Sequence, residues 1–331
     1  MAKRASTEDK LTILKKLARE PIGKDSRKAI VSALTGTNNI LAAKAAELVG
    51  KLGLEELIPD LLKAFERFSD NPLKKDKGCL AKEAIIEALD ALEYDDEAIF
   101  LQGISYFQVE PAYLRPVDTA AMLRGKCAFA LVRIGCSHIV FRLVELLTDP
   151  ERQARIAAVK ALTGISSDIS EPLLRLKIKQ GNEDQQVLAE CLYALMKVNP
   201  ENSIGFLERF LDTDDLPELD NRALILAENA ALAIGESKLE KALEILQRHR
   251  EESLNPEFQN MLLVPMALTR LEGAFDYLID IIEKGNLQSA VSAVNALKIF
   301  CDESHQSKIQ MAVISRNEPE VSEAYAAWNA E

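Results

Sequence analysis

The sequence predicts an all-α fold, an α-α superhelix of about eight to nine stacked helix pairs. Three observations predict it: a recurring helical phrase, the absence of sustained strand alternation, and a length of 331 residues with no dividing linker. The phrase returns at intervals typical of stacked helix pairs, so each pair packs on its neighbours. Its anchor residues are Leu48, Ala88, Ala130, Ala161, Ala194, Ala230, Ala267 and Ala296.

The phrase is most complete in residues 149–162. Its alanines have a mechanical reason, because a small side chain lets neighbouring helix backbones approach while a large apolar residue fills the groove alongside. Ala158, Ala161 and Leu162 take these positions. Cys127 and Cys191 occupy the place of Ala158 in the neighbouring units, so we interpret them as small core residues and not as reactive thiols.

The chain opens with two short helices, expected over 7–20 and 25–34, which form an N-terminal cap in residues 1–36. Pro21 ends the first of them. Residues 37–331 form the repeats, as one continuous domain with the cap, and a last single helix runs from 318 to Glu331. The eight pairs in between are expected at 39–50 and 54–68, 77–92 and 95–106, 118–134 and 137–147, 150–162 and 169–179, 183–198 and 200–211, 219–234 and 236–250, 256–271 and 274–284, and 287–300 and 303–316.

The prolines agree with these boundaries. Pro150, Pro200, Pro256 and Pro319 are expected in first turns, where a helix does not need the missing N–H. Pro265 is the exception, because it falls inside a predicted helix and should bend it.

The Asp149-Pro150 start, Arg155, and the alanine pair that ends in Ala161-Leu162 resemble the HEAT-repeat family. The closest form is the short repeat named for phycobilisome lyases, and the resemblance runs from about residue 37 to the end. It implies a right-handed superhelix with first helices outside and second helices lining a concave groove. Members of this family include scaffolds, transport adaptors, chromophore lyases, a DNA glycosylase group and a di-iron hydroxylase, so the resemblance leaves the chemistry open.

The net charge of −12 is unevenly distributed. Residues 1–30 hold nine Lys/Arg and four Asp/Glu, whereas residues 182–331 hold twelve and twenty-seven. An acidic half repels nucleic acid and anionic membranes and attracts a basic partner, although surface charge that serves solubility is the simpler alternative. We expect no membrane span and no secretory signal, and five cysteines without paired spacing suit a cytoplasmic protein.

No catalytic constellation stands out. The three histidines have no His-Glu pairs, and we find no phosphate loop, nucleophile elbow or zinc spacing. The acidic stretch 212–220 lacks the glycine and terminal glutamate of a calcium loop, so we expect it to be a connection between units. The prediction is a protein that is not an enzyme and that needs no cofactor or metal.

The connection 106–117 is long for a solenoid and is the first candidate binding element. It gathers Tyr106, Phe107 and Tyr113 with Arg115 around two prolines. Ordered loops rich in tyrosine and arginine are often binding elements. Alternatively, the aromatic residues only attach an insertion to the solenoid.

A second candidate is a group of cations in second helices. These are Arg142 in one unit and Arg175, Lys177 and Lys179 in the next. If second helices line the groove, these residues put positive charge inside it. A solvated helix face is the alternative.

We therefore expect a non-enzymatic protein–protein interaction scaffold or adaptor that presents a concave groove to a partner with a basic region. One alternative is a nucleic-acid-binding or HEAT-type DNA glycosylase-like protein, although the acidic half makes nucleic acid an unlikely partner. The other is a lyase or chaperone-like factor for chromophore attachment, which rests on the resemblance.

Replacing Ala161 with leucine tests the predicted contact between first helices. The larger side chain overpacks that contact, so Ala161→Leu should lower the free energy of unfolding by about 1–3 kcal/mol. Urea denaturation measures the change, and a wild-type midpoint for the variant would contradict the proposed repeat register.

Overall fold

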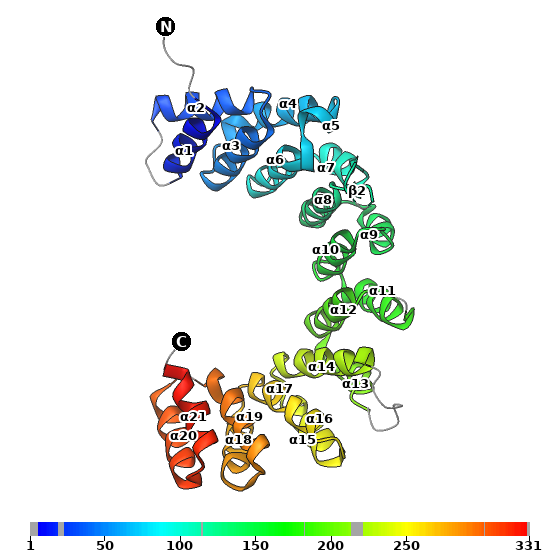
Figure 1. Cartoon of the computed structure of the whole chain (residues 1–331). Coiled ribbons are helices and arrows are strands. Elements are labelled where there is room, and N and C mark those ends of the chain that lie inside the picture. Colours follow the sequence, from blue (N-terminus) through cyan, green and yellow to red (C-terminus); the bar gives the residue numbers. More distant parts are fainter. Residues whose placement is uncertain are drawn as a thin grey trace. The chain divides into compact units, whose positions relative to one another are not determined.

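The computed structural model describes residues 6–18, 23–113, 115–181, 183–212, 221–300 and 302–329. Helices make up most of it, and they follow one another as stacked pairs (Figure 1). The chain divides into two compact units, Met1–Ile165 and Ser166–Glu331. The predicted all-α fold of stacked helix pairs is confirmed. Pro21, most of the predicted acidic connection and the end of the last helix at Glu331 lie outside the described residues.

The first unit carries the cap and the first repeats. Its elements are α1 Thr7–Leu17, α2 Lys24–Leu34, α3 Asn39–Lys51, η1 Glu55–Leu57, α4 Ile58–Ser69, α5 Pro72–Lys75, η2 Lys77–Cys79, α6 Leu80–Ala91, α7 Glu97–Ile104, β1 Val109–Glu110, β2 Val117–Asp118, α8 Ala121–Ile134, α9 Ile139–Leu147 and α10 Arg152–Leu162. The capping helices α1 and α2 both pack against α3.

The second unit continues the pattern. Its elements are α11 Ser167–Lys179, α12 Gln185–Val198, α13 Pro200–Glu208, α14 Asn221–Glu236, α15 Glu240–Glu252, α16 Pro256–Met261, α17 Leu263–Leu268, α18 Glu272–Lys284, α19 Leu287–Ala296, η3 Leu297–Ile299, α20 Glu303–Arg316, α21 Pro319–Ala326 and η4 Ala327–Asn329.

The alanine-rich first helices form one layer in each unit. In the first unit α3 packs on α6, α6 on α8 and α8 on α10, and in the second unit α12, α14, α17, α19 and α21 follow in the same way. Figure 1 shows α3, α6, α8 and α10 on the inner side of the first unit's bend, with α4 and α9 outside them. The expectation that first helices lie outside is therefore wrong.

Side-chain size explains this reversal. The first helices approach closely: a Cβ added at Gly50 of α3 would lie only 3.0 Å from the Cα of Ala88 in α6. The second helices instead bury bulky residues such as Phe65 and Phe68 of α4. The layer with the smaller residues has the shorter spacing and so takes the inner side of a curve.

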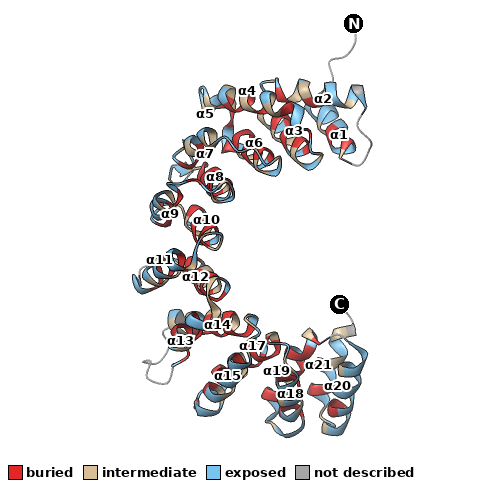
Figure 2. Cartoon of the chain, turned by 180° about the vertical axis from the view of Figure 1, so that it is seen from behind, coloured by how far each residue is buried: buried red, intermediate tan, exposed pale blue. Residues whose placement is uncertain are grey.

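The core lies between the two layers, on the faces where helices meet (Figure 2). Ala158, Ala161, Cys127 and Cys191 are all buried there. Burial raises the pKa of Cys191 to about 12 and raises the pKa of Cys127 well above its ordinary value. Both thiols are therefore protonated at neutral pH, in agreement with their interpretation as small core residues.

The prolines fall largely as expected. Pro200, Pro256 and Pro319 each occupy the first turn of a helix. Pro150 does not, because α10 begins at Arg152, two residues later. The helix that holds Pro265 is interrupted: α16 ends at Met261, whose carbonyl would accept the missing N–H of Pro265, and α17 begins at Leu263.

One stretch departs from the helical expectation. Residues 109–110 and 117–118 form two antiparallel strands, whereas the sequence showed no strand and a helix was expected to begin at residue 118. Each strand has only two residues, so the all-α class is unaffected. Within the described residues, no helix has an apolar run long enough to cross a membrane.

Substitutions at two glycines, Gly235 and Gly205, test how tightly the first helices of the second unit pack on one another. A Cβ at Gly235 of α14 would lie 2.8 Å from the carbonyl carbon of Pro265 and 3.0 Å from its Cα, so backbone would have to move. Gly235→Ala should lower the free energy of unfolding by about 1–3 kcal/mol. Gly205→Ala in α13 is the control, because nothing lies within 4 Å of its added methyl group. There alanine should stabilise the helix by about 0.5–1 kcal/mol, and equal denaturation midpoints for the two variants would refute the close contact.

Candidate functional site

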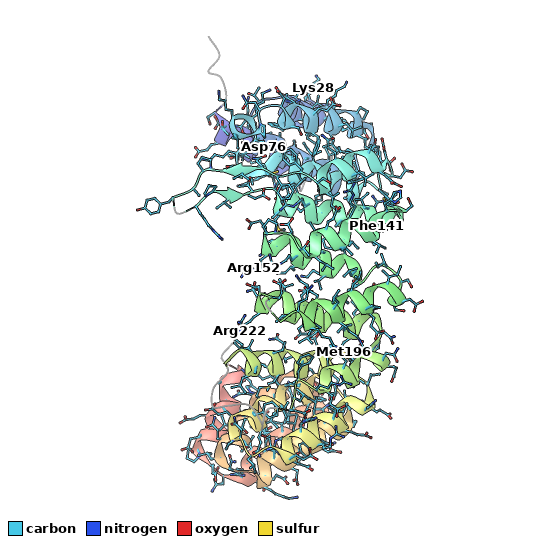
Figure 3. All side chains as sticks on the ribbon, turned by 90° about the vertical axis from the view of Figure 1, so that its right-hand side faces the viewer. Lys28, Asp76, Phe141, Arg152, Met196 and Arg222 are labelled. Carbon is cyan, nitrogen blue, oxygen red and sulfur yellow. The ribbon has the colours of Figure 1, made fainter. Side chains whose placement is uncertain are left out.

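Residues 107–113 and 115–118 belong to a hairpin, named here the braced hairpin, which projects from the helices of the first unit (Figure 3). Val109 pairs with Asp118 and Glu110 with Val117. Proline has no N–H to give to a strand ladder, and Pro111 and Pro116 immediately flank the paired residues on the side of the tip. The tip is therefore held by its base, and the bonds at that base decide where it points.

The base rests on a fully buried ion pair. The Nζ of Lys82 in α6 lies 2.8 Å from Oδ2 of Asp76, and neither side chain is exposed to solvent. The other oxygen of Asp76 accepts hydrogen bonds from Asn39 Nδ2 at 3.2 Å and from the backbone N–H of Ala81 at 2.9 Å. A buried carboxylate requires such partners, and Asp76 obtains them from the two helices α3 and α6.

Gln108 and Glu110 connect the hairpin to this ion pair. Gln108 Nε2 donates to the backbone carbonyl of Asp76 and to Glu110 Oε1, both at 2.7 Å. The same Glu110 oxygen accepts from the backbone N–H of Gly78 at 2.6 Å and from Thr119 Oγ1 at 2.9 Å. Burial acts to raise the pKa of Glu110, but these hydrogen bonds outweigh it and the pKa is lowered. The carboxylate is thus an ionised acceptor that ties β1 to the loop before α6.

Arg124 of α8 fastens the other strand. Its guanidinium is buried and makes two parallel bonds to Asp149, from Nε at 2.8 Å and from Nη2 at 2.9 Å. Its Nη1 donates to Asp118 Oδ2 at 2.6 Å and to the Tyr106 carbonyl at 2.9 Å. The Phe107 ring lies against the same group, 4.1 Å from its central carbon. One arginine thereby joins both ends of the hairpin to the loop before α10.

These side chains form one buried polar network. Its members are Asp76, Lys82, Gln108, Glu110, Asp118, Arg124 and Asp149. Such a network contributes little to the net stability of a protein. Removing one of its members nevertheless destabilises the protein strongly, because a buried charge is left without its partner. The network therefore allows only one arrangement of the segments that it joins. The orientation of the hairpin is consequently a property of three neighbouring repeats.

The four residues predicted in the 106–117 connection all belong to this structure. Tyr106 is half-buried, its ring centre is 5.3 Å from Lys82 Nζ, and burial raises its pKa to about 12. Phe107 is 53% exposed, Tyr113 near the tip is fully exposed and Arg115 is exposed. Tyr106 therefore attaches the connection to α6, whereas Phe107, Tyr113 and Arg115 are exposed to solvent.

Most of the predicted cations of the second helices form ion pairs within their own unit. Arg142 lies in α9 of the first unit and forms an ion pair with Glu145 at 3.0 Å. Arg175 in α11 forms an ion pair with Glu171, one helical turn earlier, at 2.6 Å. Lys177, also in α11, forms a buried ion pair with Glu183. Lys179 is exposed. Arg142, Arg175 and Lys177 are thus each paired with a carboxylate, and a role of these cations in partner binding stays a prediction.

The members of the buried polar network were missed by the sequence analysis. A signal existed, because Lys82 and Arg124 lie on helix faces where the residues one turn further along are apolar. A long cation on an apolar helix face needs a buried anion, and Asp76 and Asp149 precede first helices. Which carboxylate pairs with which cation depends on how the repeats stack.

The second unit has a different local surface. A cavity of about 290 Å³ lies between α14 and α16 and is lined by both acidic and apolar residues. The carboxylates belong to Glu228 and Glu257, and Ile225, Phe258 and Met261 supply apolar wall. In the described part of the chain, no three His, Cys, Asp or Glu side chains gather as metal ligands would.

Acid should loosen the braced hairpin through Glu110. Because its pKa is lowered from 4.5 in the folded protein, its stabilising contribution is complete above that pH and is lost as the pH falls below it. Glu110→Gln should therefore lower the urea midpoint at neutral pH and flatten its decline between about pH 5 and about pH 3. Glu66→Gln, at an exposed position of α4, is the matched control and should keep the wild-type slope. An unchanged slope in Glu110→Gln would show that this carboxylate does not hold the hairpin.

Comparison with known proteins places this geometry in context. Residues 140–228 match the family model described as HEAT repeats. No curated protein sequence matches the chain.

The solved complex of CpcE and CpcF of phycocyanin lyase from Nostoc sp. PCC7120 is similar at 14% identity and a TM-score of 0.32, covering 94% of this chain and 97% of that chain. Human deoxyhypusine hydroxylase in complex with glycerol is similar at 15% identity and a TM-score of 0.31, covering 98% and 95%. A mutant of Kap121p is similar at 14% identity and a TM-score of 0.43, covering 98% of this chain and 40% of that chain. Residues 140–228 therefore match HEAT repeats, as the phrase of residues 149–162 predicted.

Proposed function

We propose that this protein is a non-enzymatic scaffold that binds a partner protein, and that the braced hairpin is one of its contact elements. The observation that supports it is an exposed tyrosine, Tyr113, on a hairpin whose base is fixed by buried ion pairs. Tyrosine and arginine are enriched among the residues that dominate binding energy, and Arg115 is exposed two positions further on. A support that is already ordered reduces the entropy lost on binding.

We further propose that the acidic half of the chain receives a basic region of a partner. Residues 182–331 hold twelve Lys/Arg and twenty-seven Asp/Glu, and this field favours a positively charged protein. The cavity between α14 and α16 supports the idea, because it combines carboxylates with an apolar wall that suits the aliphatic stem of a lysine or arginine.

The sequence also allows two other functions: a nucleic-acid-binding or HEAT-type DNA glycosylase-like protein, and a lyase or chaperone-like factor for chromophore attachment. The charge of residues 182–331 counts against the first, since phosphate backbones need a broad basic surface. The second is supported by resemblance alone. A scaffold is therefore the function that we propose.

Replacing Tyr113 with alanine tests the scaffold. A partner recovered with the wild-type protein and identified should bind Tyr113→Ala at least about tenfold more weakly in a titration, because truncating a central aromatic contact costs about 2 kcal/mol or more. Phe141→Ala is the matched control: Phe141 is a strongly exposed aromatic residue of the same unit, on α9 and away from the hairpin (Figure 3). Equal affinities for the two variants would rule out the hairpin as a contact. Recovery of nucleic acid alone would rule out the scaffold itself.

A further inference from the structure

We infer that the surface around the braced hairpin binds a protein segment that is both acidic and apolar, although the chain as a whole carries a net charge of −12. This inference rests on the proposed scaffold function and names the chemistry of the partner at this one surface. It concerns the first unit only. The surface consists of the hairpin together with residues 73–80, which lead into α6.

The carboxylates of this surface are turned inward. Asp76 is bound by Lys82, Glu110 by Gln108 and Thr119, and Asp118 by Arg124. All of these contacts belong to the buried polar network or to residues that touch it. The negative charge of these carboxylates is therefore compensated by buried partners. It contributes little to the electrostatic potential at the surface around the hairpin.

The cations of the same region face outward. Lys74 and Lys77 are exposed beside the base of the hairpin, and Arg115 is exposed on it. The backbone N–H of Gly78 bonds to Glu110 at 2.6 Å, which holds Lys77 next to β1. Lys75 is paired with Asp70, and that pair adds no net charge. The accessible charge around the hairpin is thus positive.

Exposed apolar side chains lie among these cations. Leu73 precedes Lys74, Leu80 begins α6 and Val109 lies in β1. Each exposes more than two fifths of its surface, with values of 52%, 46% and 55%. Phe107 and Val117 add to them on the hairpin itself. Interfaces combine an apolar centre with charge pairs that fix register, so carboxylates next to leucine or aromatic residues would complement this pattern.

A protein segment fits better than a nucleic acid or a lipid surface. Three cations are few for backbone binding to nucleic acid, which depends on many phosphate contacts. An anionic membrane would attract the cations as well, but stable attachment needs a larger apolar insertion or a polybasic cluster. Binding to vesicles is therefore treated as a competing outcome of the experiment.

The test uses the full chain and a phage-displayed library of random peptides. The selected peptides should be enriched in Asp and Glu together with Leu, Phe, Tyr or Trp. The affinity of the best peptide is then measured for the wild type, for Tyr113→Ala, and for the double variant Lys74→Glu/Lys77→Glu. Charge reversal should weaken binding by roughly tenfold or more and should reduce its salt dependence.

The matched control is Lys51→Glu/Lys63→Glu, which makes the same change of charge at exposed lysines of α3 and α4 in the same unit. Its affinity should stay close to the wild-type value. Equal weakening by both double variants, selection of basic peptides, or failure to select any peptide would overturn the inference. So would binding to vesicles of phosphatidylserine and phosphatidylcholine that Lys74→Glu/Lys77→Glu abolishes while peptide binding is unchanged.

The two proposals fail in different ways. If Tyr113→Ala weakens peptide binding and Lys74→Glu/Lys77→Glu does not, the hairpin remains a contact element and the acidic–apolar partner is refuted. If neither variant changes the affinity, both proposals are refuted. Circular dichroism and the urea midpoint of each variant confirm that the comparison is made between folded proteins.

Discussion

Close contact between alanine-rich first helices is the constraint on which the rest of the structure depends. At Gly50 and Ala88 the backbones of α3 and α6 come so near that an added methyl group would touch the opposite Cα, and Gly235 meets the backbone of Pro265 in the same manner. Small residues shorten the spacing of one layer, while phenylalanines such as Phe65 keep the other layer wider. The direction in which the first unit bends follows from this difference.

The same stacking creates the setting for buried charge. Lys82 and Arg124 lie on faces of first helices that are otherwise apolar, and each is neutralised by an aspartate located just before a first helix. Removing either partner would leave a charge without water or counter-charge, so the network tolerates one arrangement only. The braced hairpin is built on that arrangement. An ordered base under an exposed loop reduces the entropy lost on binding, and this supports the role proposed for the hairpin.

The two units offer surfaces of different chemistry. Around the braced hairpin of the first unit, carboxylates such as Glu110 are bound internally and exposed lysines such as Lys77 remain. In the second unit, carboxylates such as Glu228 line an open cavity. Net charge alone, at −12, would have indicated a uniformly acidic protein. Hydrogen bonding decides which charges a partner meets, and this is why the proposed partners of the two surfaces differ.

Local pattern was sufficient for some features of this protein. The spacing of alanines predicted which helices pack together, the burial of Cys127 and Cys191 followed from their place in that spacing, and the interruption before Pro265 follows from a missing N–H. Other features depend on contacts between residues far apart in the chain. The pairing of Gln108 with Asp76 spans 32 residues and that of Arg124 with Asp149 spans 25, so no local pattern contains them. For the same reason the attachment of the hairpin to the loop before α6 and the inner position of the first helices in the first unit were decided only when the repeats stacked.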